Sequence, residues 1–158
     1  MFIVIEGQDA TGKDTQATKL VEYFQNQGKK VVHYAEPAIK NNDIAIITRY
    51  WFSTYIYEGY GTGVSRSLIT RLHKMIMPEI YFKPDKIVIL TLSDKERQER
   101  MVSQRKRTKE FFKSQDAKYG KKLNDAYLKV AKEFNIPTLN TFGTPDEVFE
   151  RLKKIWSI

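Results

Sequence analysis

The sequence predicts an α/β fold in which a five-stranded parallel sheet lies between two layers of helices. Short apolar runs alternate along the chain with longer segments whose apolar residues recur at helical spacing. Parallel strands need crossover connections, and because these are right-handed they place helices on both faces of the sheet. The 158 residues contain no internal repeat, low-complexity segment or linker, so we expect one domain.

Five apolar segments are expected to form the strands. The first, residues 2–6, is a short uninterrupted apolar run, as in a strand that is buried on both faces. The fourth follows Pro84 and Asp85, which mark a turn before it. The five expected strands are residues 2–6, 30–34, 44–48, 86–92 and 137–141.

The segments between the strands are expected to be helical. Residues 14–27 have apolar side chains at helical spacing, and Gly28 stands where a helix C-cap is expected. The last helix is expected to begin after Thr144, whose hydroxyl can cap it. The other expected helices are residues 51–59, 65–77, 94–104 and 114–134.

Composition excludes several classes of protein. The chain has no cysteine, which rules out disulfides and thiolate metal sites, and two histidines are too few for a zinc cluster. No apolar run reaches membrane-spanning length. The first residues lead directly into a strand-like run, without a charged segment or cleavage site, so a cytoplasmic protein is expected.

The net charge of +8 suits three kinds of surface. It fits a solvated lysine-rich surface, a nucleic-acid binding face, or a site for small polyanions. Basic residues are dense in residues 97–113, and an enzyme that transfers phosphate needs such a group near its substrates. Charge alone therefore leaves the three alternatives open.

Residues 7–16, "GQDATGKDTQ", contain the spacing of a phosphate-binding loop between an expected strand and an expected helix. The glycines allow backbone N–H groups to surround phosphate oxygens, and the following helix adds its positive N-terminal dipole. Lys13 is expected to reach the β- and γ-phosphates of ATP. The residues expected to bind ATP are Gly7, Gln8, Asp9, Ala10, Thr11, Gly12, Lys13, Asp14 and Thr15.

Asp14 departs from the usual motif, which has a serine or threonine hydroxyl as a magnesium ligand at this position. A carboxylate beside phosphates is repulsive unless a cation lies between them, and Mg²⁺ favours carboxylate oxygens. We therefore expect Asp14 to face the metal, with Thr15 as a second hydroxyl nearby. Favourable placement at a helix N-terminus is the alternative role for Asp14.

Residues 48–63, "TRYWFSTYIYEGYGTG", together with residues 2–16 and the Glu36-Pro37 pair, resemble the thymidylate kinase family. The family motif runs Asp-Arg-Tyr, two residues, Ser-Ser, two residues, Tyr-Gln-Gly, one residue, Gly. The stretches "KPDKIVILTL", "DKERQERMVSQRKR" and "AYLKVAKEF" are similar to later family segments and follow in the same order. The resemblance covers nearly the whole chain.

The resemblance implies a three-layer α/β/α P-loop kinase fold, with one nucleoside monophosphate kinase domain over residues 1–158 and a lid around residues 104–114. It implies phosphoryl transfer from ATP, with Mg²⁺, to a deoxypyrimidine monophosphate, either dTMP or a 5-substituted dUMP. The partners are then ATP and this monophosphate. A homodimer is implied by the resemblance alone.

Site residues also follow from the resemblance, position by position. Arg49 should hold the acceptor phosphate, and Tyr57 should lie beside the deoxyribose and disfavour a 2′-hydroxyl. Arg105 and Arg107 stand where lid arginines are expected, and Ala10 replaces an arginine that one subgroup carries in its loop, so the lid should supply the catalytic charge. The remaining acceptor-site positions are Asp9, Glu36, Pro37, Ser53, Thr54 and Glu58.

Three departures from the family pattern bear on the acceptor and the metal. Thr48 replaces the motif aspartate, so a carboxylate has been lost there and gained at Asp14. Glu58 replaces a glutamine that reads the base, and a carboxylate only accepts hydrogen bonds. Only residues 38–43 separate Pro37 from the third strand, where the family has a long helical segment with a base-stacking aromatic. Candidates for replacing that aromatic are Trp51, Phe52 and Tyr60.

Two other functions remain as alternatives. One is a P-loop kinase that acts on another deoxynucleoside or nucleotide. The other is an ATP-binding regulatory or nucleic-acid module without enzymatic activity, which the charge of +8 favours slightly. The chain has no recognisable nucleic-acid motif, and this argues against the second alternative.

Overall fold

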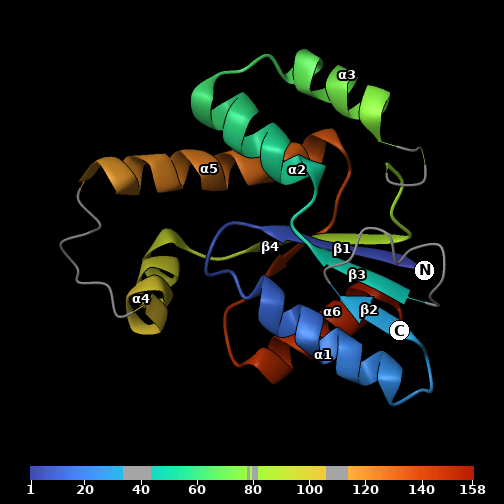
Figure 1. Ribbon diagram of the computed structural model, residues 1–158. Helices are drawn as coiled ribbons and strands as arrows, with labels where there is room; N and C mark the ends of the chain where they lie inside the picture. Colours follow the sequence, from blue (N-terminus) through green and yellow to red (C-terminus); the bar gives the residue numbers. More distant parts are fainter. Residues whose placement is uncertain (34–43, 78, 80–81, 106–113) are drawn as a thin grey trace.

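A computed structural model describes residues 1–33, 44–77, 79, 82–105 and 114–158. Its centre is a parallel sheet in the order β2-β3-β1-β4-β5, which confirms the predicted fold class (Figure 1). The five strands are β1 (Phe2–Gly7), β2 (Val31–His33), β3 (Ile44–Thr48), β4 (Lys86–Thr91) and β5 (Thr138–Asn140).

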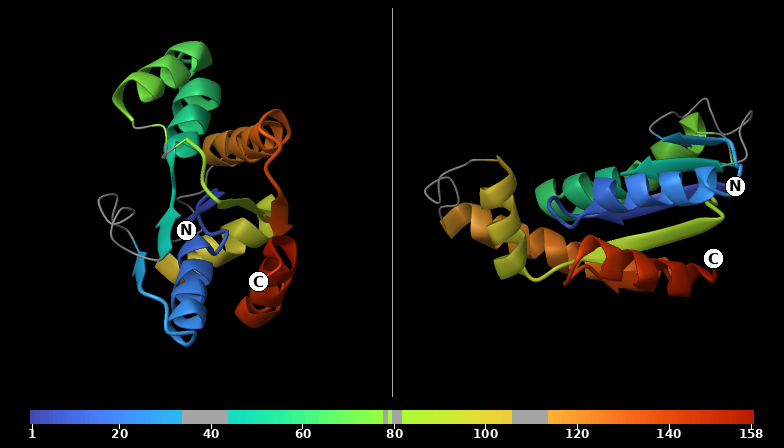
Figure 2. Two further views of the ribbon diagram at one scale, coloured as in Figure 1. Left: turned by 90° about the vertical axis from the view of Figure 1, so that its right-hand side faces the viewer. Right: turned by 90° about the horizontal axis from the view of Figure 1, so that it is seen from below.

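Helices cover both faces of the sheet. Helices α1 and α6 lie on one face, whereas α2, η2, α3 and α5 lie on the other (Figure 1). Helix α4 lies beyond the carboxyl ends of the strands in all views (Figure 2). The helices are α1 (Lys13–Gln25), α2 (Trp51–Thr54), η2 (Tyr55–Thr62), α3 (Arg66–Ile76), α4 (Asp94–Arg105), α5 (Ser114–Glu133) and α6 (Pro145–Trp156).

Two apolar cores form because side chains of a strand alternate between the faces of a sheet. Phe2 and Val4 pack with α2, η2 and α5 on one face. Ile3 and Ile5, from the same strand, pack with α1 and α6 on the other face. The central strand β1 is therefore buried on both sides, as its uninterrupted apolar sequence predicts.

Two helix ends behave as the sequence predicts. After α1, Gly28 has φ +75°. The Gly28 N–H donates a hydrogen bond to the Gln25 carbonyl, and the Lys29 N–H donates one to the Phe24 carbonyl. These are the two bonds of a Schellman motif with glycine at the left-handed position. Before α6, Thr144 accepts a hydrogen bond from the Glu147 N–H and the Glu147 side chain accepts one from the Thr144 N–H, forming a capping box.

The helix expected over residues 51–59 differs from the prediction. Helix α2 ends at Thr54, and the chain continues to Thr62 as η2, a π-helix with wider turns. Two glycines of η2 allow close packing, because a Cβ at Gly59 would lie 2.6 Å from Arg66 Cγ and one at Gly61 would lie 2.8 Å from Tyr119 Oη. π-Helical turns are rare in proteins as a whole, and those that do occur are often found at functional sites.

Among the residues that the structure describes, no helix is both long enough and apolar enough to cross a lipid bilayer.

Candidate active site

The loop between β1 and α1 has the backbone conformation that its glycines predict. Gly7 has φ +145° and Gly12 has φ +87°, both in the region that L side chains rarely adopt. A Cβ at Gly7 would lie 2.6 Å from the Leu90 carbonyl of the adjacent strand β4. Ala10 takes φ +64° without being glycine. The loop therefore lies at the carboxyl end of the central strand, where parallel sheets place their ligand sites.

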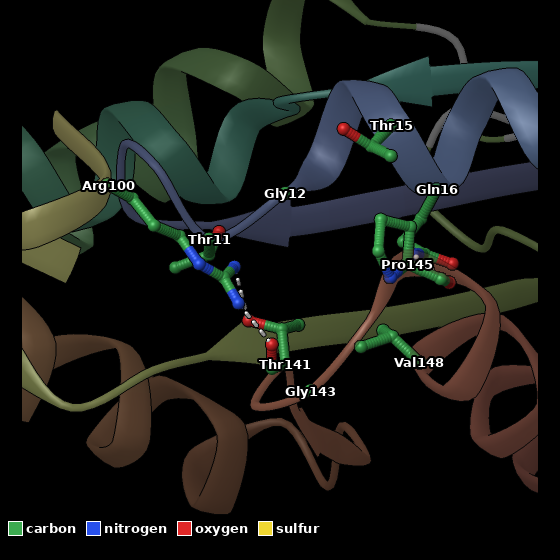
Figure 3. Close-up of a pocket in the computed structure, with 9 residues that line it drawn as sticks. All are labelled: Thr11, Gly12, Thr15, Gln16, Arg100, Thr141, Gly143, Pro145 and Val148. Carbon is green, nitrogen blue, oxygen red and sulfur yellow. Dashed lines mark hydrogen bonds between the residues drawn. The ribbon is translucent and has the colours of Figure 1, made fainter. Parts of the chain in front are cut away.

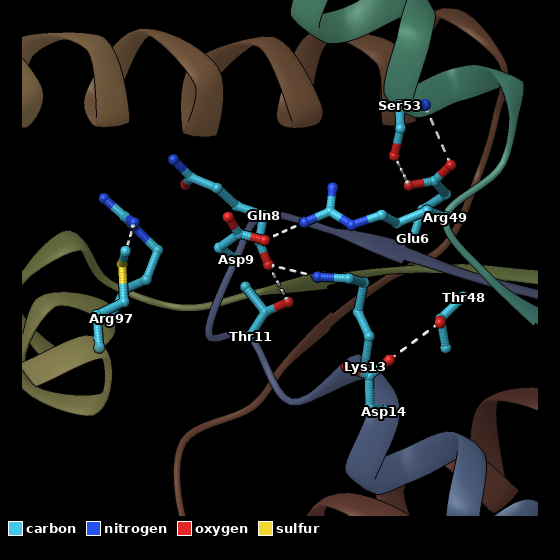
Figure 4. A network of polar contacts seen from close by, with 11 residues as sticks. Glu6, Gln8, Asp9, Thr11, Lys13, Asp14, Thr48, Arg49, Ser53 and Arg97 are labelled. Atoms are coloured by element: carbon cyan, nitrogen blue, oxygen red, sulfur yellow. Dashed lines mark hydrogen bonds and ion pairs between the residues drawn. The ribbon is translucent and has the colours of Figure 1, made fainter. Parts of the chain in front are cut away.

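Lys13 is folded back onto this loop. Its Nζ donates a hydrogen bond of 2.8 Å to the Gln8 carbonyl, which also accepts one of 2.8 Å from Thr11 Oγ1 (Figure 4). Only 6% of the Lys13 surface is exposed. Burial, and to a lesser extent the positive charge of Arg49, lower the Lys13 pKa from 10.5 to about 8, although nearby carboxylates oppose this shift. This ammonium group is therefore short of compensating negative charge.

Glu6, which precedes the loop, anchors the start of α2. Its buried carboxylate accepts a hydrogen bond of 2.6 Å from the Tyr50 N–H. It also accepts one of 2.8 Å from the Ser53 hydroxyl (Figure 4). Burial raises the Glu6 pKa, although these hydrogen bonds oppose the shift. Ser53, a predicted acceptor-site residue, thus bonds Glu6, and this contact fixes the backbone immediately after Arg49.

Arg49 lies beside the loop with two other predicted site residues. It adopts a left-handed backbone conformation with φ +70°, forms an ion pair with Asp9, and has its guanidinium carbon 5.8 Å from the Tyr57 ring centroid. Non-glycine residues in this conformation are uncommon and cluster at functional sites. Because Lys13 interacts electrostatically with both Asp9 and Arg49, four predicted residues meet at the loop.

Asp14 and Thr48 are hydrogen-bonded to each other. The Thr48 hydroxyl donates to Asp14 Oδ1 at 3.0 Å, across the gap between the start of α1 and the end of β3 (Figure 4). In the described part of the chain, no three His, Cys, Asp or Glu side chains group together as a metal cage. One carboxylate with neighbouring hydroxyls still suits Mg²⁺, which takes few protein ligands and completes its shell with water and substrate phosphates.

A pocket of about 220 Å³ opens on the other side of the loop (Figure 3). Arg100 from α4 crosses it, and its Nη2 donates a hydrogen bond of 2.6 Å to the Thr141 carbonyl. The lining residues are Thr11, Gly12, Thr15, Gln16, Arg100, Thr141, Gly143, Pro145 and Val148. Thr11, Gly12 and Thr15 are among the residues expected to bind ATP, whereas sequence reasoning missed the part of the pocket that α4 and the segment after β5 form. The position of Arg100 in the basic stretch 97–113 was a signal for that part.

Two predicted acceptor-site residues, Thr54 and Glu58, have no described contact with the loop residues. Thr54 is exposed, and Glu58 is exposed and accepts a hydrogen bond of 3.1 Å from Thr62 Oγ1. Four further predictions fall on parts that the structure does not describe: Glu36, Pro37 and Arg107 lie outside the described residues, and so does the Arg105 side chain at the end of α4.

The prediction that Trp51 or Phe52 stacks on a base is wrong. Both side chains are buried and stack on each other, with ring centroids 4.2 Å apart. They lie in the apolar core because they begin α2, whose first turn packs on the sheet. Tyr60 is partly buried, and the Arg66 guanidinium carbon lies 4.4 Å from its ring centroid.

Comparison with known proteins agrees with this arrangement. The family model described as thymidylate kinase matches residues 30–152. A thymidylate kinase from Caldicellulosiruptor saccharolyticus is 25% identical over 198 residues, covering 98% of this chain and 94% of that protein. A probable thymidylate kinase 1 from Saccharolobus solfataricus is 27% identical over 192 residues, covering 98% and 95%.

A solved structure has the same fold. The crystal structure of thymidylate kinase from Ehrlichia chaffeensis matches with a TM-score of 0.72 and 20% identity, covering 99% of this chain and 98% of that one. The alignments of 198 and 192 residues are longer than this chain of 158 residues, so these relatives contain residues that this chain lacks. Because the family model matches most of its length, this chain belongs to the thymidylate kinase family and is a nucleoside monophosphate kinase, a phosphotransferase.

Proposed function

We propose that this kinase transfers the γ-phosphoryl group of ATP to a deoxypyrimidine monophosphate, either dTMP or a 5-substituted dUMP. The observation that carries the proposal is the meeting of Lys13, Asp9, Arg49 and Tyr57 at the phosphate-binding loop. Arg49 is paired there with Asp9, whereas Lys13 forms no ion pair that the structure describes and keeps a lowered pKa despite the neighbouring carboxylates. Such a site suits two phosphorylated substrates whose negative charges must be brought together.

ATP would lie along the loop from residue 7 to residue 15. Loop N–H groups and the start of α1 would hold its phosphates. The pocket beside Gly12 suits its adenosine, because it is continuous with the loop and combines the Arg100 guanidinium with the apolar surfaces of Pro145 and Val148. Lys13 would exchange the Gln8 carbonyl for phosphate oxygens, which supply the negative charge that it lacks.

Asp14 would hold Mg²⁺, with the Thr48 hydroxyl keeping its carboxylate oriented and Thr15 nearby. When bound, the ion neutralises charge between the phosphates of ATP. This assignment explains how a carboxylate can occupy a position next to the phosphate chain, where it would otherwise repel them. Asp14 and Thr48 thus carry the carboxylate and the hydroxyl at positions that are interchanged relative to the family pattern.

On the acceptor side, Arg49 would release Asp9 and bind the phosphate of the monophosphate. Tyr57, beside Arg49, would pack against the deoxyribose, and Thr54 and Glu58 on the same segment would face the base after local rearrangement. Ser53 would act through Glu6 in holding this segment. The roles of Glu36, Pro37, Arg105 and Arg107 rest on the family resemblance.

In the transfer step, an oxygen of the acceptor phosphate forms a bond to the γ-phosphorus as the bond from this phosphorus to the β–γ bridging oxygen breaks. ADP leaves with that electron pair, and no proton needs to move. Lys13 and Arg49 contribute by positioning the two substrates and by balancing the charge that shifts between them. The product is a deoxynucleoside diphosphate.

The test is ADP formation with a panel of ribo- and deoxynucleoside monophosphates at saturating ATP. We expect dTMP or a 5-substituted dUMP to be phosphorylated best. A clear preference for dGMP or dAMP would overturn the pyrimidine assignment, and ATP binding without transfer to any monophosphate would favour a regulatory module. Tyr57→Ala should reduce discrimination against ribonucleotides, whereas Tyr23→Ala, on the opposite layer beside Phe149, should leave it unchanged.

A further inference from the structure

Arg97 is a buried cation that has no role in the transfer step proposed above. Only 6% of its surface is exposed. Its Nη1 contacts the Met101 sulfur at 3.1 Å, a weak acceptor, and its Nε forms a long ion pair of 3.7 Å with Asp94 Oδ1 that is not a hydrogen bond. Burying a charge with so little compensation is costly. Arg97 is therefore poorly explained as a purely structural residue.

The surroundings of Arg97 show that space has been made for its guanidinium. Gly120 lies inside the 20-residue helix α5, where glycine is about 1 kcal/mol less favourable than alanine. A Cβ at Gly120 would lie 2.5 Å from Arg97 Nη2, so a larger residue would displace the guanidinium. The position of the Arg97 guanidinium thus explains why a glycine is present at this point of the helix.

The same junction includes Gln8 of the phosphate-binding loop. Its Nε2 donates a hydrogen bond of 2.9 Å to the Gly120 carbonyl, and its buried Oε1 has no hydrogen-bond partner within the described part of the chain. Figure 4 shows Arg97 and Gln8 on the same side of the loop. Both side chains are at least nine-tenths buried. An anion held by the loop next to Gln8 would offer the guanidinium a stronger hydrogen-bond acceptor than the Met101 sulfur.

The geometry of α4 indicates which part of ATP lies there. Arg97 and Arg100 are three residues apart and so project from one face of the helix. Arg100 lies 3.8 Å from the position of a Cβ at Gly12 and lines the proposed adenosine pocket, whereas Arg97 lies near Gln8 at the other end of the loop. A triphosphate that starts at the pocket and follows the loop has its γ-phosphate at the Gln8 end.

We propose that Arg97 is a catalytic residue that contacts the γ-phosphoryl group of ATP during transfer. This inference rests on the proposed function and adds a charge from the body of α4 to the arginines expected in the lid. The Arg97 N–H groups donate to the equatorial oxygens of the transferring group while the acceptor oxygen attacks and ADP leaves. The guanidinium stays protonated throughout, so the step needs no further reactant.

The experiment compares Arg97→Gln with Arg100→Gln, a matched change one turn along the same helix. Arg97→Gln should lower kcat about 100-fold or more, the usual loss when a donor to transition-state charge is removed, and should leave ADP affinity unchanged. Arg100→Gln should weaken ADP and ATP binding alike. Arg97→Lys should recover part of the turnover, because it restores the charge without the planar guanidinium.

Turnover within about threefold of wild type in Arg97→Gln would overturn the proposal, as would equal losses of ADP and ATP affinity. If the variant does not fold, the contact can be tested by NMR on the wild-type protein. The signal of the Arg97 Nε–H should shift when ADP and aluminium fluoride are added together, but not with ADP alone. An unchanged signal would refute the contact. Wild-type protein that phosphorylates no monophosphate would instead refute the proposed function. In that case a shift of the Arg97 signal with ATP but not with ADP would still support the contact with the γ-phosphate, and no shift would refute it.

Discussion

Replacing Lys13 with methionine should abolish phosphoryl transfer and, at the same time, stabilise the protein without nucleotide. Lys13 is buried, and burial together with Arg49 lowers its pKa to about 8. The folded protein therefore holds the charged form of this side chain at a cost. Methionine fills a similar volume without charge. The Gln8 carbonyl that Lys13 now contacts would keep its hydrogen bond from Thr11 Oγ1.

The expected size follows from the pKa of Lys13 in the folded and unfolded protein. The difference between 10.5 and about 8 corresponds to about 3.4 kcal/mol, at 1.36 kcal/mol for each pKa unit. Loss of the hydrogen bond to Gln8 removes about 1 kcal/mol of stability. At pH 7 the free energy of unfolding of Lys13→Met should therefore exceed that of the wild type by about 2 kcal/mol.

The advantage of the variant should depend on pH in one direction. Between pH 8 and 10.5 the unfolded wild type binds more protons at Lys13 than the folded protein does, so the wild type gains stability relative to the variant as pH rises. Below pH 8 the full cost of the charge remains. The gap between the two proteins should thus be widest near pH 7 and shrink toward pH 10.

Urea unfolding of both proteins at pH 7 and pH 10, without nucleotide, measures this gap. Lys29→Met, a change at an exposed lysine beyond α1, is the control and should alter stability little at either pH. Added ATP should stabilise the wild type far more than Lys13→Met, because phosphate oxygens replace the Gln8 carbonyl only when the ammonium group is present. A Lys13→Met protein that is no more stable than the wild type at pH 7 would refute the reasoning.

Two further predictions concern the metal and the lid. Asp14→Ser should weaken the apparent affinity for Mg²⁺ and improve ATP binding without metal, because it removes a negative charge next to the phosphates. Thr48→Val should weaken the affinity for Mg²⁺ less, because it removes only the hydrogen bond that orients the Asp14 carboxylate. Superimposable magnesium titrations of kinase activity for Asp14→Ser and wild type would contradict the metal role and leave Asp14 as a charge in the first turn of α1. At least one of Arg105→Ala and Arg107→Ala should lower kcat far more than ATP affinity, as expected for charges that act mainly in the transition state. Normal turnover in both variants would identify this basic segment as a solvated surface.

Sequence reasoning located the sheet and the phosphate-binding loop because both depend on local patterns. Residues 2–6 are apolar without interruption, which is typical of a strand buried on both faces, and β1 extends over Phe2–Gly7. For the same reason the expected helix and strand boundaries lie close to those observed, except over residues 51–59, where the α-helix ends at Thr54 and a π-helix follows. The spacing of Gly7, Gly12 and Lys13 determines the loop almost by itself, since few backbones satisfy two such glycines between a strand and a helix.

The parts of the site that sequence reasoning missed join segments that are distant along the chain. The proposed adenosine pocket combines the loop, α4 and the residues after β5, and no local pattern relates Arg100 to Thr141. Arg97 belongs to a charged stretch that reads as solvated surface, yet its burial depends on Gly120 in the following helix. The sequence offers Trp51 and Phe52 as base-stacking candidates, because a residue's position in the motif does not reveal that its side chain packs in the core, as both of these do.

The π-helix η2 has a consequence for how this chain can change in length. A π-helix holds more residues in each turn than an α-helix, so deleting one residue within Tyr55–Thr62 would allow it to revert to α-helical winding. The smaller rotation per residue of a π-helix and the loss of one residue would then nearly cancel, so the chain beyond the deletion would keep almost the same direction. Gly59 and Gly61 are harder to change, because Arg66 of α3 and Tyr119 of α5 leave no room for a Cβ at these positions. The segment can therefore lose one residue more readily than it can gain a side chain at either glycine.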